Sequence, residues 1–211
     1  MLVCKHRLTD CNEAQNVVKQ AGITIANSAK EANGGDYIGN INWNQALRLN
    51  RMLGGRTLLP REFEDFILLL KSGKAKNGRG EDVSMNELET VLKEILEVRD
   101  PWRAEWLDAD FKYLDASGNK ISSATPGELY MNYNHELRNG VLVPKFHEKL
   151  EPCLMKDVKA RLASMNAQGM AVEEGEDFYF WYPRKDNESV ARFDAVSDRA
   201  NLNCNGLPDY S

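Results

Sequence analysis

The stretch from Asn40 to Gly73, NINWNQALRLNRMLGGRTLLPREFEDFILLLKSG, contains two helical patterns in close succession. In the first pattern the apolar residues fall mostly on one helical stripe, and Gly54 or Gly55 can take the left-handed conformation that ends a helix. The second begins at Pro60, whose missing N–H would be unpaired in a first turn anyway, and ends at Gly73. The apolar positions are Ala46, Leu47, Leu49, Met52 and Leu53 in the first pattern, and Phe63, Phe66, Ile67 and Leu70 in the second.

A third helix is predicted after the capping box Ser84–Glu87, SMNE, in which the serine oxygen accepts an early N–H and the glutamate reaches back. Its apolar face comprises Leu88, Val91, Leu92 and Ile95. The segment 153–169, CLMKDVKARLASMNAQG, has aligned apolar residues and a terminating glycine, and it predicts a fourth helix.

Strand patterns fill most of the second half of the chain. WRAEWLDADFKYLD alternates apolar and polar residues and leads into DASGNK, a typical hairpin turn. ELYMNYN, GVLVPKF and DFYFWYP are further strand candidates, and we expect the last to be buried rather than to stack on bases. The elements occur in the order helices, strands, one helix and then more strands. This order favours an α+β fold with a mostly antiparallel sheet.

Composition excludes several classes of protein. A chain of 211 residues with 42% hydrophobic residues can bury a core, and it is most simply one domain. A net charge of -5 and no basic stripe argue against a nucleic-acid partner. No apolar run approaches the length of a membrane span, and no signal-peptide pattern follows Met1, so we expect no membrane span in this chain.

Signatures of chemistry are absent or weak. GxGxxG, GxxxxGK[ST], HExxH and GxSxG do not occur, and no cofactor is expected. WLDADFKYLDASGN contains Asp108, Asp110 and Asp115. We expect Asp108 and Asp110 to share a solvated strand face, and a calcium site in this stretch is the minor alternative. A zinc site is a second minor alternative to buried or free thiols, with Cys4, His6 and Cys11 joined by Cys153 or His147. Tyr130, Tyr133 and His135 either line a site or pack.

Ten residues of the opening region carry a resemblance to a known family. They are Asn42, Trp43, Ala46, Gly55, Arg56, Leu59, Pro60, Glu62, Phe63 and Glu64. In this order they resemble the formylglycine-generating-enzyme (sulfatase-modifying-factor) branch of the C-type lectin fold, in which Asn and Trp lead into a helix, followed by a Gly-Arg, Leu-Pro and acidic-aromatic-acidic run. The family usually has Trp where this chain has Phe63. The resemblance implies a single C-type lectin-like domain over 1–211, with a divergent insertion at about 74–170.

The chain's end resembles the family's C-terminal region in its SVARF element at 189–193. Family members then close with a strand that ends in a Gly-aromatic/aliphatic-Arg triplet, which is not present up to Ser211. Enzymes of the family oxidise a substrate cysteine with a pair of redox cysteines in this region. Only Cys204 lies there, on the apolar side of the alternation, where a low-pKa thiolate would have no cationic partner. Formylglycine-generating-like oxidation is therefore the alternative reading, and we expect no enzyme.

The fold's other use is as the variable protein of a diversity-generating retroelement, whose C-terminal surface is rewritten at template adenines. AAC or AAT codons altered only at adenine never encode Lys, Glu, Gln, Met or Trp. These types form roughly a fifth of the chain, so composition predicts about four in the eighteen residues from Asp194. The window contains none. A terminal strand and turn rich in Asn, Asp and Gly is the structural alternative.

The sequence therefore predicts a ligand-binding display protein with a variable region at 190–211. Small or apolar scaffold residues alternate there with exposed variable ones, as adaptable binding surfaces require. The scaffold is Ala195, Ala200, Leu202, Cys204 and Pro208. The predicted ligand-binding residues are Asp194, Val196, Asp198, Arg199, Asn201, Asn203, Asn205, Gly206, Leu207, Asp209 and Tyr210.

The resemblance implies a protein or cell-surface ligand that varies by design, and it suggests surface display or export. A lectin-like adhesin or phage receptor-binding protein without programmed variation is a further alternative. If the division into scaffold and variable residues holds, replacing Asn201, Asn203 and Tyr210 together shifts the melting temperature by only a few degrees, roughly the effect of surface changes, whereas Leu202→Asp unfolds the region.

Overall fold

A computed structural model describes residues 41–52, 54–77, 79–98, 104–186, 188–196 and 199–209. Predictions for residues 1–40, among them the zinc ligands Cys4, His6 and Cys11, lie outside this part of the chain. The helices are α2 (Trp43–Met52), α3 (Pro60–Ser72) and α4 (Met85–Leu96). The strands are β1 (Ala104–Leu114), β2 (Glu128–Arg138), β3 (Val141–Lys149), β4 (Val158–Ala160), β5 (Phe178–Trp181), β6 (Ser189–Val196) and β7 (Arg199–Gly206).

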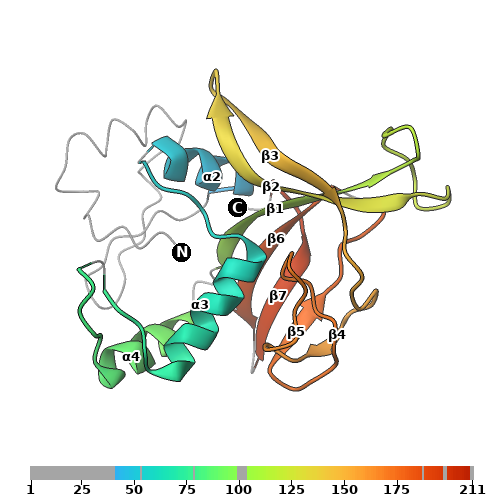
Figure 1. The fold of residues 1–211 in the computed structure, drawn as a ribbon. Helices are drawn as coiled ribbons and strands as arrows, with labels where there is room; N and C mark the ends of the chain where they lie inside the picture. The colour runs from blue at the N-terminus through green and yellow to red at the C-terminus, as the bar shows by residue number, and fades with distance from the viewer. Residues whose placement is uncertain are drawn as a thin grey trace.

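The strands form one seven-stranded sheet in the order β3-β2-β1-β6-β7-β5-β4 (Figure 1). Every pair is antiparallel except β5 and β7, which run parallel. The expected α+β class and the mostly antiparallel sheet are confirmed. The chain passes from β5 to β6 and then inserts β7 between them, so the last strand has a partner on both sides.

Helices cover both faces of the sheet. Trp43 and Leu47 of α2 pack with Val190 and Trp106, whereas Phe63 of α3 belongs to the cluster that contains the next residue of β1, Leu107. Because neighbouring residues on a strand point to opposite faces, α2 and α3 lie on opposite sides of β1. In Figure 1, α2 lies near β2 and β3, and α3 and α4 lie below it in the view.

Local capping explains where the three predicted helices begin. Asn42 and Gln45 exchange hydrogen bonds between side chain and backbone, of 2.9 and 3.0 Å, at the start of α2. Ser84 and Glu87 form the predicted capping box of α4. These bonds satisfy N–H groups that have no partner within the helix. All three helices are confirmed, and Gly73 ends α3 with a φ of 72°.

The Gly-Arg and Leu-Pro run forms hydrogen bonds that fix the start of α3. Arg56 donates two hydrogen bonds, of 2.5 and 2.6 Å, to the Glu62 carboxylate. The same carboxylate accepts the N–H of Leu59 at 3.0 Å, directly before Pro60. A bidentate pair fixes both position and orientation, so this motif sets the angle at which the chain enters α3.

The predicted fourth helix over 153–169 is wrong. The segment forms the short strand β4, which pairs with β5, and then turns. The Asn166 side-chain oxygen accepts the N–H groups of Gln168 and Met170, and Asp177 accepts the N–H of Leu162. Strand pairing and side-chain to backbone bonds thus satisfy groups that a helix would have paired, and tertiary context overrides a helical pattern of apolar residues.

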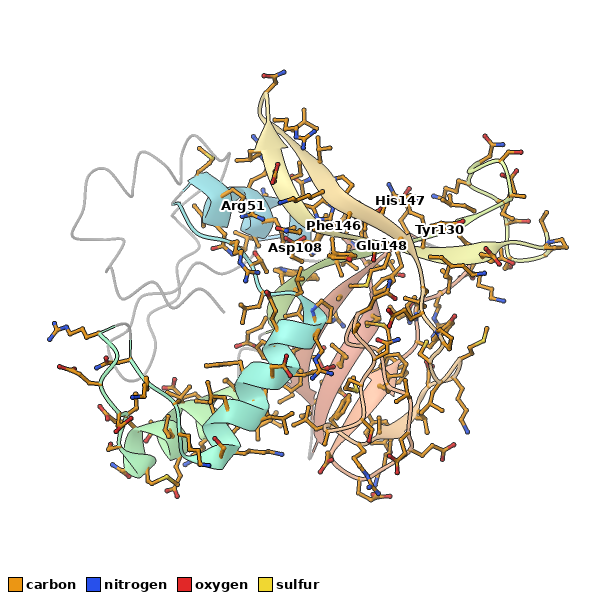
Figure 2. All side chains as sticks on the ribbon, viewed as in Figure 1. Arg51, Asp108, Tyr130, Phe146, His147 and Glu148 are labelled. Carbon is orange, nitrogen blue, oxygen red and sulfur yellow. The ribbon has the colours of Figure 1, made fainter. Side chains whose placement is uncertain are left out.

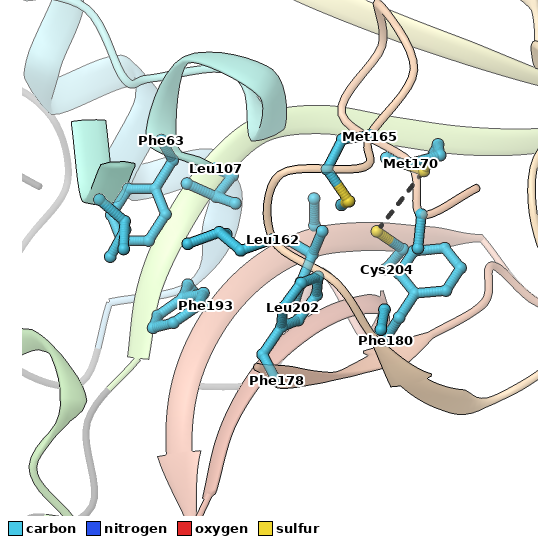
Figure 3. Packing of buried hydrophobic residues seen from close by; sticks show 14 of the residues in the cluster. Phe63, Leu107, Leu162, Met165, Met170, Phe178, Phe180, Phe193, Leu202 and Cys204 are labelled. Carbon is cyan, nitrogen blue, oxygen red and sulfur yellow. Dashed lines mark hydrogen bonds between the residues drawn. The ribbon is translucent and has the colours of Figure 1, made fainter. Parts of the chain in front are cut away.

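The main core lies between α3, α4 and the sheet (Figure 3). Phe63 and Phe193 contact each other there, with ring centres 4.8 Å apart. Leu202 and Cys204 of β7 are 1% and 0% exposed. Phe178 and Phe180 are also buried, so the expected buried strand in DFYFWYP is confirmed. One face of the β6–β7 strand pair therefore packs in the core.

Candidate functional site

A cluster of buried charges lies on the face of β1 that α2 covers. His135 of β2 is placed between two carboxylates, with Nδ1 2.5 Å from Asp108 and Nε2 3.0 Å from Asp110. His135 is 3% exposed and Asp108 is 1% exposed. The expectation that Asp108 and Asp110 form a solvated face is wrong, because α2 covers that face.

His135 reaches this face because strand alternation is interrupted just before it. Asn132 shares a face with Asp110, to which its side chain donates a 2.8 Å hydrogen bond. Regular alternation would turn His135 to the opposite side. Asn134 has a φ of 55°, a left-handed conformation that asparagine tolerates, and this turns His135 towards the aspartates. Nothing in the sequence pattern signals this break.

The cluster holds a proton at neutral pH. Burial alone would lower the pKa of His135, but the hydrogen bonds and charges of Asp108 and Asp110 outweigh it and raise the pKa to about 9. The imidazole is therefore charged and both ring nitrogens donate to carboxylates. A doubly paired imidazolium of this kind is a structural charge cluster, since neither nitrogen is left for a ligand.

A chain of hydrogen bonds leads from this cluster to the surface. Asn132, which donates to Asp110, also lies with its side-chain oxygen 2.5 Å from His147 Nδ1 on β3. The exposed His147 ring stacks on Tyr130 with centres 4.9 Å apart (Figure 2). Of the three candidate residues, Tyr130 lies on this face with His135, whereas Tyr133 stacks on Phe146 at the other face.

A second polar network joins β5, β6 and β7 within the predicted binding region. Asp194 accepts hydrogen bonds from Asn201 at 2.8 Å and from Arg192 at 3.0 Å. The Trp181 indole N–H donates to Asn201 at 3.3 Å. Burial raises the pKa of Asp194, against the lowering effect of Asn201 and Arg192. Sequence reasoning missed Trp181 and Arg192, because only strand register brings them beside β7.

The structure gives the eleven predicted ligand-binding residues different environments. Val196 and Leu207 are 39% and 52% exposed. Asp209 is exposed as well, and Asn203 and Asn205 are half-buried. Asp194, Asn201 and Gly206 are buried, so the expectation that all of them point outward is wrong for these three. Asp198, Tyr210 and the side chain of Arg199 lie outside the described part.

Strand geometry explains the three buried residues. Asp194 and Asn201 face each other in register and form a hydrogen-bonded pair. A Cβ added at Gly206 would come within 2.9 Å of the Val190 carbonyl oxygen, so this position does not accept a side chain without a shift. Among the scaffold residues, burial is confirmed for Ala195, Leu202 and Cys204, whereas Ala200 and Pro208 are half-buried.

The thiols in the core are poorly placed for nucleophilic or redox chemistry. Cys204 is fully buried, with Sγ 3.9 Å from Met170 Sδ (Figure 3), and burial raises its pKa well above the ordinary value. Burial raises the pKa of Cys153 to about 11. Cys204 lies in the main core and Cys153 packs against it, and neither forms a disulfide within the described part of the chain. A reactive cysteine needs a stabilised thiolate.

Other potential sites in the described ranges are limited. An open cavity of about 350 Å³ lies beside the end of α4, lined by residues that include Leu96, Lys159, Glu176 and Tyr179. Within those ranges, no group of three or more His, Cys, Asp or Glu residues could hold a metal ion. None of the described helices is long and apolar enough to cross a membrane.

Comparisons with known proteins add no relative. No protein-family model matches the chain, and neither the curated proteins nor the solved structures give a match. Function is therefore inferred from the residues and their geometry.

Proposed function

We propose that this protein is a ligand-binding display protein with a C-type lectin-like fold, and that its C-terminal strand pair is a surface diversified by adenine-directed retroelement mutagenesis. One observation carries the proposal. Leu202 and Cys204 of β7 are buried in the core, while Asn203, which lies between them and pairs with Arg192 and Trp181, is on the other face. Different residues of β7 therefore stabilise the fold and form the surface.

This separation supports variation at little cost to folding. Val196, Leu207 and Asp209 are exposed, and substitutions at exposed positions usually change stability by less than about 0.5 kcal/mol. β7 is held between β6 and β5, so its backbone is fixed on both sides whatever its outward side chains are. A variable surface requires such a scaffold, because the ligand changes and the fold does not.

The polar network narrows the set of positions that we propose to vary. Asp194 and Asn201 are buried and bonded to each other, and we assign them to the frame that holds Arg192 and Trp181. The proposed variable positions with described side chains are Val196, Asn203, Asn205, Leu207 and Asp209. Asp198, Arg199 and Tyr210 stay in the proposed set on the sequence pattern alone.

The chemistry of this surface suits a protein or cell-surface ligand. Asparagine amides donate and accept hydrogen bonds, and aromatic and arginine side chains supply contact area at protein interfaces. Trp181 and Arg192 flank the variable positions of β7 in the sheet register. Such a ligand is met outside the cell, which favours surface display or export.

A selection experiment tests the proposal. A library with Val196, Asn203, Asn205, Leu207 and Asp209 randomised is displayed and panned against a set of unrelated proteins. We expect folded binders with different targets and different residues at these positions. A library randomised at Lys76, Glu81, Lys93 and Glu94, exposed residues of α4 and of the segment before it, controls for binding by any mutated surface. Equal numbers of binders from both libraries would contradict the proposal and favour an adhesin with a fixed site.

A further inference from the structure

The turn that follows β7 is attached to α2 rather than only to the sheet. The backbone N–H of Trp43, the first residue of α2, donates a 3.2 Å hydrogen bond to the carbonyl of Pro208. Trp43 also belongs to the same small apolar cluster as Val190, which pairs with Gly206 in the sheet. Residues 206–209, which we call the terminal turn, are therefore held to Trp43 by one direct hydrogen bond and, through Val190, by shared packing.

The same tryptophan rests on the buried charge cluster. Its ring meets the His135 ring edge-on, with centres 5.1 Å apart. Its indole N–H donates a 2.8 Å hydrogen bond to the carbonyl of Leu107, the residue before Asp108. An edge-on contact between two rings is directional, so the orientation of His135 constrains the position of Trp43.

Arg51 fastens the other end of α2 to the cluster. Its Nε donates a 2.6 Å hydrogen bond to the His135 carbonyl, and its Nη2 donates to Asn134 Oδ1 at 3.1 Å and lies 3.8 Å from Asp108 (Figure 2). Both ends of α2 are thus held by the residues that surround His135. Trp43, at the start of α2, is the residue that contacts both the cluster and the terminal turn.

The charges that face His135 come from the elements packed around it. Asp108 and Asp110 come from β1 and Arg51 comes from α2. Lys112 lies 3.8 Å from Asp110. With the proton on His135, one imidazolium and one guanidinium balance the two carboxylates. Loss of that proton leaves two close carboxylates with less positive charge between them, and a buried, uncompensated charge drives rearrangement.

We infer that the cluster of Asp108, His135 and Asp110 positions the terminal turn through α2, so that the proton on His135 regulates the shape of the proposed binding surface. His135 is a positioning residue in this arrangement, since it touches Trp43 and not the surface itself. The inference rests on the proposed function only in treating the terminal turn as part of a binding surface. The coupling between the charge cluster and the terminal turn is a property of the fold and does not depend on a ligand.

Methyl NMR of the full chain without any ligand tests this coupling. The His135 ring C–H signals and the Leu207 methyl signals are followed between pH 7 and pH 11. Leu207 is 52% exposed in the terminal turn, and Leu69, which is 43% exposed on α3, is the matched control. We expect His135 and Leu207 to shift with one midpoint near pH 9, and Leu69 to show no inflection there. The His135→Gln variant should lose the Leu207 inflection.

Three results would overturn the inference. Leu207 signals that stay constant while His135 titrates would show that the coupling ends at α2. An equal inflection at Leu69 would show a global opening instead of a directed one. A Leu207 inflection that survives in His135→Gln would assign it to another group. The wild-type titration decides the first two even if the variant does not fold, and none of these results depends on whether a ligand exists.

Discussion

Asn201 donates a 2.8 Å hydrogen bond to Asp194 across the β6–β7 pair. Both residues lie in the window that contains no Lys, Glu, Gln, Met or Trp. Two positions predicted to vary are thus each other's buried partners. A change at one alters the environment of the other, and independent variation at both would cost stability. The structure therefore divides the predicted variable region into an inner pair and an outer set.

The inner pair predicts a stability difference within one strand. Asn201→Ala leaves the Asp194 carboxylate and the Trp181 indole short of a buried partner, which costs about 1–3 kcal/mol. Asn203→Ala, two residues along on the same face, should cost under about 1 kcal/mol. Urea unfolding of both variants measures this. Equal losses would refute the division, and a coupling energy near zero in a double-mutant cycle of Asp194→Ala and Asn201→Ala would do the same.

The burial of Asn201 corrects the expected tolerance of the triple replacement of Asn201, Asn203 and Tyr210. We now expect that variant to lose stability through Asn201 alone. Replacing Asn203 together with Asn205 is the better test of a tolerant surface. The melting temperature should then shift by only a few degrees, roughly the size of a change under 1 kcal/mol.

The core side of β7 predicts the opposite response. Leu202 is 1% exposed, and Leu202→Asp places an unpaired carboxylate in the core. We expect a loss of more than about 4 kcal/mol in the free energy of unfolding, or no folded protein. Asn203→Asp is the matched control, since it adds the same charge at the next residue and on the other face. Circular dichroism during thermal unfolding distinguishes the two, and a similar effect of both changes would contradict the assigned faces.

The charge cluster predicts a dependence of stability on pH. The pKa of His135 is about 9 in the folded chain, above its value in the unfolded chain. Its contribution is therefore fully present below the unfolded pKa of about 6.5, and it is lost as pH rises through about 9. The loss is on the order of 3 kcal/mol at most. Urea unfolding at pH 6, 8 and 10 should show a decline in the wild type that is smaller in His135→Gln. The same decline in both would contradict the pairing with Asp108 and Asp110.

Glu64 predicts a stabilising substitution. It is 3% exposed, neither carboxylate oxygen has a hydrogen-bond partner among the described residues, and burial raises its pKa well above the ordinary value. A raised carboxyl pKa gives stability that is present at low pH and is lost as pH rises above the unfolded value of about 4.3. Glu64→Leu should therefore raise the free energy of unfolding at pH 7 by about 1–3 kcal/mol, with a smaller gain at pH 4.

Asp65, the exposed neighbour of Glu64 on α3, provides the matched control. Asp65→Leu removes a surface pair with Arg61 and should change stability by less than about 1 kcal/mol. Urea unfolding of both variants at pH 7 and pH 4 makes the comparison. A loss of stability in Glu64→Leu at pH 7 would show that the carboxyl has a structural role that its contacts do not explain.

Local signals explain which elements could be predicted from the sequence. α4 begins at the Ser84 cap and α3 ends at Gly73, and both signals act within a few residues. Alternation predicts the strand that contains Asp108 and also places Asp108 and Asp110 on one face. The helix prediction for 153–169 is wrong because the pairing partner of that segment, β5, lies further along the chain.

The sites were harder to predict than the elements. Alternation gives the face of Asp108 but not what covers it, and α2 is too far away in the chain for a local pattern to place it there. His135 depends on the left-handed backbone of Asn134, which has no sequence signal of its own. In the C-terminal strands, alternation identified Leu202 and Cys204 as core residues, whereas the burial of Asn201 depends on Asp194 and Trp181.

The most direct test of the proposed function is the DNA sequence next to the coding region for residues 190–211. We predict a near-copy of these codons beside a reverse-transcriptase gene, with differences from the coding copy confined to template adenines. The differing codons should include those of Asn203, Asn205 and Leu207, and they should spare those of Leu202 and Cys204. Neither a near-copy nor a reverse-transcriptase gene nearby, or differences that fall equally on the codons of Leu202 and Cys204, would contradict the account.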